Sequence, residues 1–197
     1  MGHPAFEHSD FLDAALALVA EHGPVAVTVA AISARLKAPT GSFYHRFASR
    51  DALLAELWFN TVLAFQEGIA AALDAGDGLR AALHTPAWVR GHLDEGRLLL
   101  LFHRDDFVHG DWPGTLHDAL AEQGRRGEAR LKKLARDTFG RAGPAEIRRA
   151  QFLLSEVPVA AVRQHLLRRE PPPPIVDELI RTTWHAVVKA YRAGKRR

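Results

Sequence analysis

One short segment combines side chains suited to an apolar core with side chains suited to a nucleic acid. Residues 39–54 read PTGSFYHRFASRDALL, in which hydroxyl, imidazole and guanidinium groups stand beside two phenylalanines. On a helix with about 100° between successive residues, Phe43 and Phe47 lie about 40° apart, so both rings can enter a core. Ser42 and His45 then point outward. Small side chains and hydrogen-bond donors on one side suit a helix whose first turn enters the major groove of DNA.

A second segment has residue types that bind metal ions. Residues 102–109 read FHRDDFVH and bring together His103, Asp105, Asp106 and His109. If this segment is helical, His103 and Asp106 share one face and can bind zinc or a similar ion. The alternative is a solvated helix end. A metal-binding sensor or hydrolase is therefore the alternative function, while the main prediction includes no catalytic residue, no metal site and no cofactor.

The composition describes a chain that can bury a core without disulfides. Of the 197 residues, 47% are hydrophobic and none is cysteine, which excludes disulfides, thiol-bound metals and iron–sulfur clusters. The formal charge of +3 does not indicate nucleic-acid binding by itself, but residues 22–50 contain no acidic side chain. The opening residues lack a signal-peptide core, and the apolar run at 97–102 is too short to span a membrane. We therefore expect a cytoplasmic protein with no membrane partner.

Helical periodicity runs through nearly the whole chain, and strand signals are almost absent. We predict an all-α fold of about nine helices. Thr28 is expected to cap the second helix and Ser49 the fourth, which would be a rod of roughly 39 Å. The expected helices cover approximately residues 9–23, 28–36, 40–46, 49–75, 78–92, 94–104, 114–140, 144–170 and 175–193.

Four consecutive prolines at 171–174 separate the last two expected helices. Such a segment either docks into an aromatic groove of a partner or forms a stiff connector between two helices. Of these two, we expect the connector.

The segment TVAAISARLKAPTGSFYHRFASRDALL, within residues 9–57, resembles the DNA-binding head of the TetR family of bacterial transcriptional regulators. Thr28, the Phe43–Tyr44 pair, Phe47 and the junction at 49–54 all fall in register with that family. Two positions depart from its usual pattern, since Lys37 replaces a frequent turn glycine and Pro39 a frequent capping serine. The geometry of the turn and the capping of the third helix are open at this point.

The resemblance assigns functions to two domains, a helix-turn-helix domain at 1–52 and an all-helical effector-binding and dimerisation domain at 53–197. In the first domain, it places Thr40, Gly41 and Ser42 at base edges. It places Tyr44, His45, Thr28 and Arg50 at the sugar-phosphate backbone, together with Arg46.

In the second domain, the last two long helices would form a four-helix bundle with a second subunit. Their amphipathic pattern independently indicates that they need a partner surface, and packing within a single subunit is the alternative. The predicted interface residues are Leu154, Val157, Ala161, Leu179 and Val187. The resemblance also implies a small-molecule pocket lined by Trp58, Phe59, Val62, Phe65, Gln66, Trp88, His92, Phe102, His103 and Phe107.

The sequence thus predicts a homodimeric regulator that binds a double-stranded DNA operator and is a repressor released by a small molecule. Besides the metal-binding alternative, a nonspecific architectural DNA-binding protein is a third possibility. That protein would bind all sequences with similar affinity. The concentrated polar side of the third helix argues against it.

Overall fold

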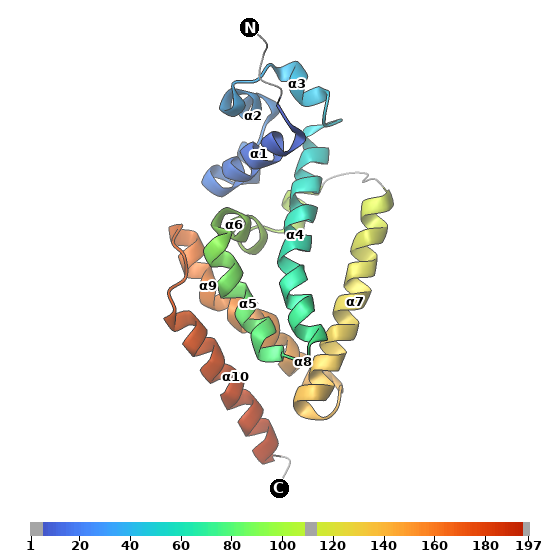
Figure 1. Ribbon diagram of the computed structural model, residues 1–197, viewed down its shortest axis with the longest axis vertical. Coiled ribbons are helices and arrows are strands. Elements are labelled where there is room, and N and C mark those ends of the chain that lie inside the picture. Colours follow the sequence, from blue (N-terminus) through green and yellow to red (C-terminus); the bar gives the residue numbers. More distant parts are fainter. Residues whose placement is uncertain (1–5, 109–113, 195–197) are drawn as a thin grey trace. The chain divides into compact units, whose positions relative to one another are not determined.

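The structure of the protein, a computed structural model, describes residues 6–108 and 114–194. The described residues form helices and contain no strand, which confirms the all-α class (Figure 1). They divide into two compact units. Unit 1 comprises Met1–Val62 and Asp94–Gly114, and unit 2 comprises Leu63–Leu93 and Thr115–Arg197. The functional boundary expected after residue 52 stays a prediction.

Unit 1 contains a head of three helices: α1 (His8–His22), α2 (Val29–Leu36) and α3 (Thr40–Tyr44). They gather around the first turns of α4 (Arg50–Asp74), which continues into unit 2 (Figure 1). Unit 1 also holds nearly all of α6 (Leu93–Leu101) and a 3-10 turn (Arg104–Asp106). The core of the head is completed by Leu98 and Phe107 from these later elements, and both are fully buried. The three helices of the head therefore do not complete its apolar core by themselves.

The expected helix caps of unit 1 are present. Thr28 Oγ1 accepts a hydrogen bond from Ala31 N at 3.0 Å, and Ser49 Oγ accepts one from Ala52 N at 3.1 Å. Lys37 adopts the left-handed conformation, with φ 55° and ψ 34°, and so makes the turn that a glycine makes more readily. Pro39 precedes the first residue of α3, which ends at Tyr44 and is shorter than expected.

A buried arginine joins α6 to α1 within unit 1. Arg97 is 9% exposed, and its Nε donates a 3.0 Å hydrogen bond to the carbonyl oxygen of Ala20. That carbonyl belongs to the last turn of α1, where backbone acceptors lack helical partners and a positive charge is favourable. The sequence does not predict this contact, because Arg97 opens the apolar run RLLLLF and nothing near it indicates a partner in α1.

Unit 2 is built from α5 (Gly78–Gly91), α7 (Gly114–Phe139), α8 (Pro144–Gln151), α9 (Val157–Arg168) and α10 (Ile175–Gly194). Helices α5, α9 and α10 pack side by side (Figure 1). The single helix expected at 144–170 is interrupted by a π-helical segment, Phe152–Glu156. Pro158 explains the interruption, because proline has no N–H for the carbonyl four residues earlier and its ring displaces that carbonyl.

The four prolines connect α9 to α10 and are held from α5. Arg90 Nε donates to the carbonyl of Pro172 at 2.7 Å, and its Nη2 donates to Asp177 at 2.8 Å in the first turn of α10. Pro172 is buried. These contacts support the stiff connector that the sequence predicts.

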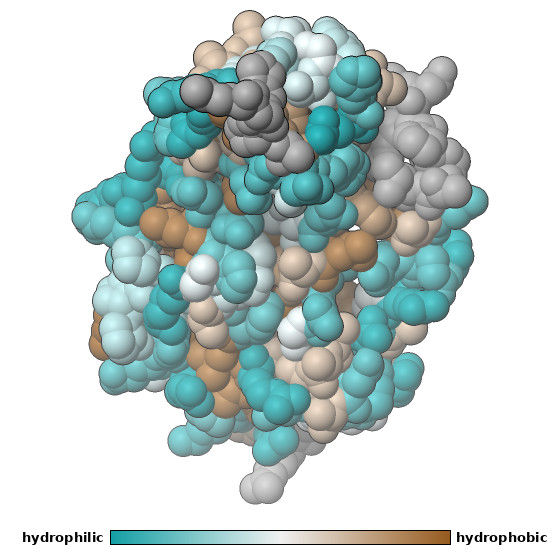
Figure 2. Space-filling view, turned by 45° about the horizontal axis from the view of Figure 1, so that its top comes forward, coloured by the Kyte–Doolittle hydropathy of each residue, from teal (hydrophilic) through white to brown (hydrophobic). Residues whose placement is uncertain are grey.

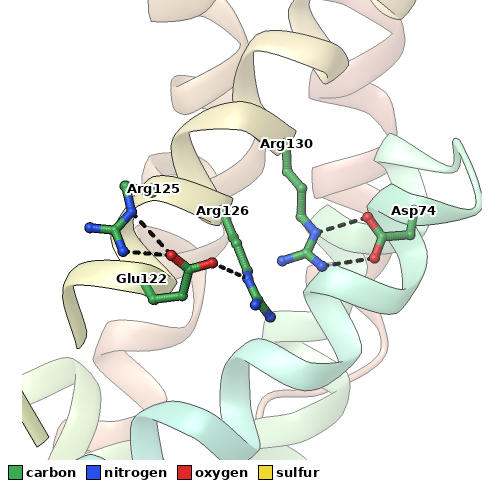
Figure 3. Close-up of polar contacts among 5 residues, drawn as sticks. All are labelled: Asp74, Glu122, Arg125, Arg126 and Arg130. Atoms are coloured by element: carbon green, nitrogen blue, oxygen red, sulfur yellow. Dashed lines mark hydrogen bonds and ion pairs between the residues drawn. The ribbon is translucent and has the colours of Figure 1, made fainter. Parts of the chain in front are cut away.

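Unit 2 also contains an ion pair between the end of α4 and α7 (Figure 3). Arg130 Nε donates to Asp74 Oδ1, and Arg130 Nη2 donates to Asp74 Oδ2, both at 2.8 Å. The hydrogen bond from Arg130 lowers the pKa of Asp74. Nearer the start of α7, Glu122 accepts hydrogen bonds from Arg125 and Arg126, both at 2.6 Å. These shorter-range pairs stabilise α7 itself.

The surface in the space-filling view is mostly hydrophilic, and its hydrophobic residues form separate patches between hydrophilic ones (Figure 2). None of the helices that the structure describes is both long enough and apolar enough to cross a membrane.

Candidate nucleic-acid interface

Helix α3 has a buried aromatic side and an exposed polar side. Phe43 is fully buried and Phe47 is 4% exposed, and their ring centres lie 5.5 Å apart. Phe11 of α1 packs edge-on against Phe43, with 6.0 Å between ring centres. Tyr44 is 60% exposed, and His45 is exposed as well. The predicted orientation of the helix is confirmed.

The first turn of α3 presents little bulk to solvent. Thr40 and Gly41 are exposed, and Ser42 is partly exposed. A Cβ atom added to Gly41 would meet no atom within 4 Å, so packing within the head does not require a glycine there. Because Gly41 has no side chain, nothing projects from the helix at this position, and another molecule can approach its backbone closely.

Thr28 is exposed at the start of α2. Its Oγ1 accepts the capping hydrogen bond described above, and a hydroxyl group also carries a proton that it can donate. Thr28 can therefore cap α2 and donate to a phosphate oxygen at the same time.

The two arginines predicted at the interface are bonded inside the head. Arg46 Nη1 donates to the carbonyl of Ser42 at 3.0 Å, its Nη2 donates to the carbonyl of Phe6, and its guanidinium lies over the ring of Phe11. Arg50 donates to the carbonyls of Pro24 and Val27, and its Nη1 donates to Asp51 Oδ1 at 2.9 Å. Backbone carbonyls satisfy donors without neutralising charge, so Arg46 keeps its positive charge, whereas Asp51 partly neutralises that of Arg50.

The residues predicted for an effector pocket divide between the two units. In unit 1, Phe59, Val62 and Phe107 are buried, with Phe107 in the core of the head. Trp58 and Phe102 are partly buried, and His103 is exposed. The pocket assignment itself stays a prediction.

The unit 2 members of that set belong to a stack of aromatic and imidazole rings. Trp88 is 8% exposed; its ring centre lies 5.0 Å from that of Phe65 and 4.8 Å from that of His92. His84, which the sequence did not indicate, donates from Nε2 to the carbonyl oxygen of Phe65 at 2.9 Å. Burial lowers the pKa of His84. Gln66, the remaining predicted residue, is exposed.

The segment proposed for metal binding is a 3-10 turn rather than an α-helix, and its side chains cap that turn. The carboxylate of Asp106 accepts a 2.7 Å hydrogen bond from the backbone N–H of His103, and the His103 side chain accepts one in return. His109 lies outside the described residues. Within the described part of the chain, no group of three or more histidine or acidic side chains is placed to hold a metal ion.

Three short helices, a tight turn before the third, and an exposed polar side on that third helix define a helix-turn-helix DNA-binding protein. Residues 11–57 match the family model described as bacterial regulatory proteins, tetR family. The head is therefore a DNA-binding domain of the TetR type, and the protein is a DNA-binding transcriptional regulator. No individual curated protein matched the chain.

Proposed function

We propose that the protein is a repressor that binds its operator as a homodimer and leaves it when a small molecule binds. The observation that carries the proposal is the exposed polar side of α3 above the buried rings of Phe43 and Phe47. We propose no catalytic role for any residue, and we place the protein in the cytoplasm, where bacterial DNA is accessible.

The exposed residues of the head are assigned to two kinds of DNA contact. Base edges are approached by the first turn of α3, which consists of small residues: Thr40, Gly41 and Ser42. Tyr44, His45 and Thr28 bind sugar-phosphate groups, because they carry donors at the sides of that turn. Arg50 and Arg46 add positive charge close to the phosphates while they brace the head.

The apolar pattern of α10 supports a homodimer. Val176, Ile180 and Trp184 form its buried stripe, yet Ile175 and Leu179 remain 50% and 58% exposed. A helix with a second apolar side needs another surface to cover it. The proposed interface comprises Leu154, Val157, Ala161, Leu179 and Val187. A dimer of this class reads successive major grooves when its two recognition helices lie about 34–36 Å apart.

Helix α4 supports the proposed release, because its residues belong to both units. A ligand bound among the predicted pocket residues would change the tilt of α4 and so the separation of the two heads. The dimer then has two arrangements, one with the head separation that fits the operator and one without it. A ligand can weaken operator binding only to the extent that it binds the second arrangement more tightly than the first.

Tyr44 gives the direct test of DNA binding. Genomic fragments retained by the protein would be sequenced to define an operator, which then serves as probe in anisotropy titrations. We expect Tyr44→Ala to weaken binding about tenfold through loss of a charge-assisted hydrogen bond, and Tyr44→Phe to lose most of the same affinity. The circular dichroism and thermal midpoint of both variants should match those of the wild type.

Unchanged operator affinity in Tyr44→Ala would remove the proposed interface. Retention of all fragments with equal affinity would instead favour an architectural protein.

To test the release, small molecules from a library are added to the operator complex in the same anisotropy assay. If no compound dissociates the complex, regulation by a ligand is contradicted, but DNA binding is not.

Sedimentation of the wild type and of Leu179→Arg tests the dimer interface. We expect a dimer for the wild type and a monomer for the variant; a wild-type monomer at the concentration of DNA binding contradicts the dimer.

A further inference from the structure

A recess of about 590 Å³ lies in unit 2 between the start of α8 and the end of α10. Its volume falls within the range of small-molecule sites, about 300–1,000 Å³. Two arginines and a tyrosine supply its polar groups, and small apolar residues supply the rest. The lining residues are Arg141, Arg149, Val187, Ala190, Tyr191 and Gly194. None of them belongs to the effector set predicted at 58–107.

A buried carboxylate fixes the polar side of this recess. Glu146 is 1% exposed and lies behind the lining residues, where its Oε1 pairs with Arg141 Nε at 2.9 Å and accepts a hydrogen bond from the Tyr191 hydroxyl at 2.9 Å. Burial works to raise the pKa of Glu146, but these two partners outweigh it and lower the pKa. Glu146 is therefore ionised near neutral pH and orients both partners.

The ring of Tyr191 is held from two further directions. Phe139 packs edge-on against it, with 4.9 Å between ring centres, and the guanidinium of Arg149 lies 5.2 Å from the centre of its ring. Arg149 Nη1 donates to the carbonyl of Ala145 at 3.1 Å. The tyrosine and both arginines are thus positioned by contacts within unit 2, before any ligand arrives.

The charges of the recess are not balanced. Two guanidinium groups face one carboxylate, and no acidic side chain lines the recess itself. A guanidinium carries five N–H donors, and the contacts above use few of them, so donors remain on Arg141 and Arg149 for an added acceptor. An anion is favoured in this recess and a cation is not.

We propose that the recess binds a small organic anion, in which a carboxylate or phosphate group contacts Arg141 and Arg149 and an apolar body packs on Val187 and Ala190. Planar guanidinium groups bind both kinds of oxyanion through paired hydrogen bonds. The apolar wall distinguishes an organic anion from an inorganic one. This site is separate from the effector pocket of the proposed function and does not depend on it; it shares only Val187 with the proposed dimer interface.

The chain contains two tyrosines, which permits a direct measurement on the intact protein. Incorporation of 3-fluorotyrosine gives one ¹⁹F signal for Tyr191 in the recess and one for Tyr44 in the head, and Tyr44→Phe assigns them. The probes are benzoate, phenyl phosphate, the neutral benzamide and inorganic phosphate, at constant ionic strength. We expect benzoate or phenyl phosphate to shift the Tyr191 signal to saturation while the Tyr44 signal stays in place.

Variants at the two arginines identify the contact. Arg149→Gln should weaken binding about ten- to a hundredfold, and Arg141→Lys, which keeps a charge beside Glu146 but loses the planar fork, should weaken it about tenfold. Arg148→Gln is the matched control, because Arg148 is exposed on the same helix and binds Glu156 at 2.9 Å instead of lining the recess.

Three results would overturn the proposal: no saturable shift of the Tyr191 signal with either organic anion, equal binding of benzamide, or equal weakening by Arg148→Gln. Inorganic phosphate that binds as tightly as phenyl phosphate would overturn the role of the apolar wall. Binding that survives in Tyr44→Phe with reduced operator affinity separates this site from the proposed DNA function.

Discussion

The head and unit 2 use their arginines in partly different ways. In the head, Arg46 donates to backbone carbonyls, and Arg50 donates to two carbonyls and to the carboxylate of Asp51. In unit 2, Arg130 and Arg148 each place two nitrogens on one carboxylate, that of Asp74 or Glu156, as Arg35 does with Glu21 in the head. A carbonyl satisfies a donor but leaves the positive charge, whereas a carboxylate cancels it. Arg46, beside the polar side of α3, therefore keeps its charge for a polyanion, while Arg35, Arg130 and Arg148 are neutralised by their partners.

The aromatic clusters also differ. In the head, Phe11, Phe43 and Phe47 pack on one another and are at most 4% exposed, and the only imidazole stacked on them in the described residues is that of the exposed His8, 4.2 Å from Phe47 between ring centres. In unit 2, the half-buried His84 packs against Phe65, and burial lowers its pKa. The stability of unit 2 should therefore respond to pH through His84. The four predictions below test this difference, in order of decreasing effect.

The largest effect is expected in the apolar core of the head. Phe47→Ala should lower the free energy of unfolding by about 3–5 kcal/mol and abolish DNA binding, because the cavity replaces a ring that packs against the rings of His8, Phe11 and Phe43. Chemical denaturation measures the change. The matched control is Phe152→Ala in unit 2, where the ring is 38% exposed and a loss of less than about 1 kcal/mol is expected. Equal losses in the two variants would contradict the contrast between the cores.

The next effect concerns the fit of His84 against α4. A Cβ atom on Gly68 would overlap the His84 imidazole, so Gly68→Ala should displace the ring from the Phe65 carbonyl and cost about 1–3 kcal/mol. Gly124→Ala is the control on α7, since an added Cβ there meets no atom within 4 Å. That change should stabilise the protein by about 0.5–1 kcal/mol through helix propensity. Thermal unfolding of both variants checks the opposite signs.

A third prediction follows from the lowered pKa of His84. Burial favours the neutral imidazole, so the unfolded chain, in which the pKa is near the ordinary value of 6.5, takes up the proton first as the pH falls. The contribution of the neutral His84 to the free energy of unfolding is complete above pH 6.5. It is lost as the pH falls from 6.5 through the lower pKa that His84 has in the folded protein. His84→Gln should reduce this loss in thermal midpoints measured across that range. His185→Gln, at an exposed position of α10, should leave the pH dependence unchanged; the same flattening in both variants would contradict the assignment.

The smallest effect is expected at the exposed ion pair of Asp74 with Arg130. Asp74→Asn should lower the thermal midpoint slightly at neutral pH, and added salt should shrink the difference because it screens exposed charges. Arg130 lowers the pKa of Asp74, so the ion pair contributes its full stability above pH 3.8, the ordinary pKa of an aspartate. This stability is lost as the pH falls through the lower pKa of Asp74 in the folded protein. Glu67→Gln, also exposed on α4, is the control and should show neither dependence. A larger difference in high salt would exclude the electrostatic origin.

The sequence was sufficient where local rules apply. The caps at Thr28 and Ser49, the stop at Gly23 and the two sides of α3 all depend on residues within a few positions of one another. Helical periodicity and capping operate over that distance, so a single sequence reveals them. The prediction of one continuous helix at 144–170 was wrong at Pro158, because a proline inside a helix removes an N–H donor and displaces a carbonyl of the preceding turn.

The contacts between distant residues came from the tertiary structure alone. Arg97 with Ala20, Glu146 with Tyr191, and His84 with Phe65 each join segments that are at least 19 residues apart. An arginine, a glutamate or a histidine in a helix is usually exposed, and nothing in the neighbouring residues indicates otherwise. The sequence therefore determined which helices form and which side of α3 is polar, because those depend on short-range spacing. Only packing decided which charged side chains are buried and which partners they meet, because that depends on how the helices come together.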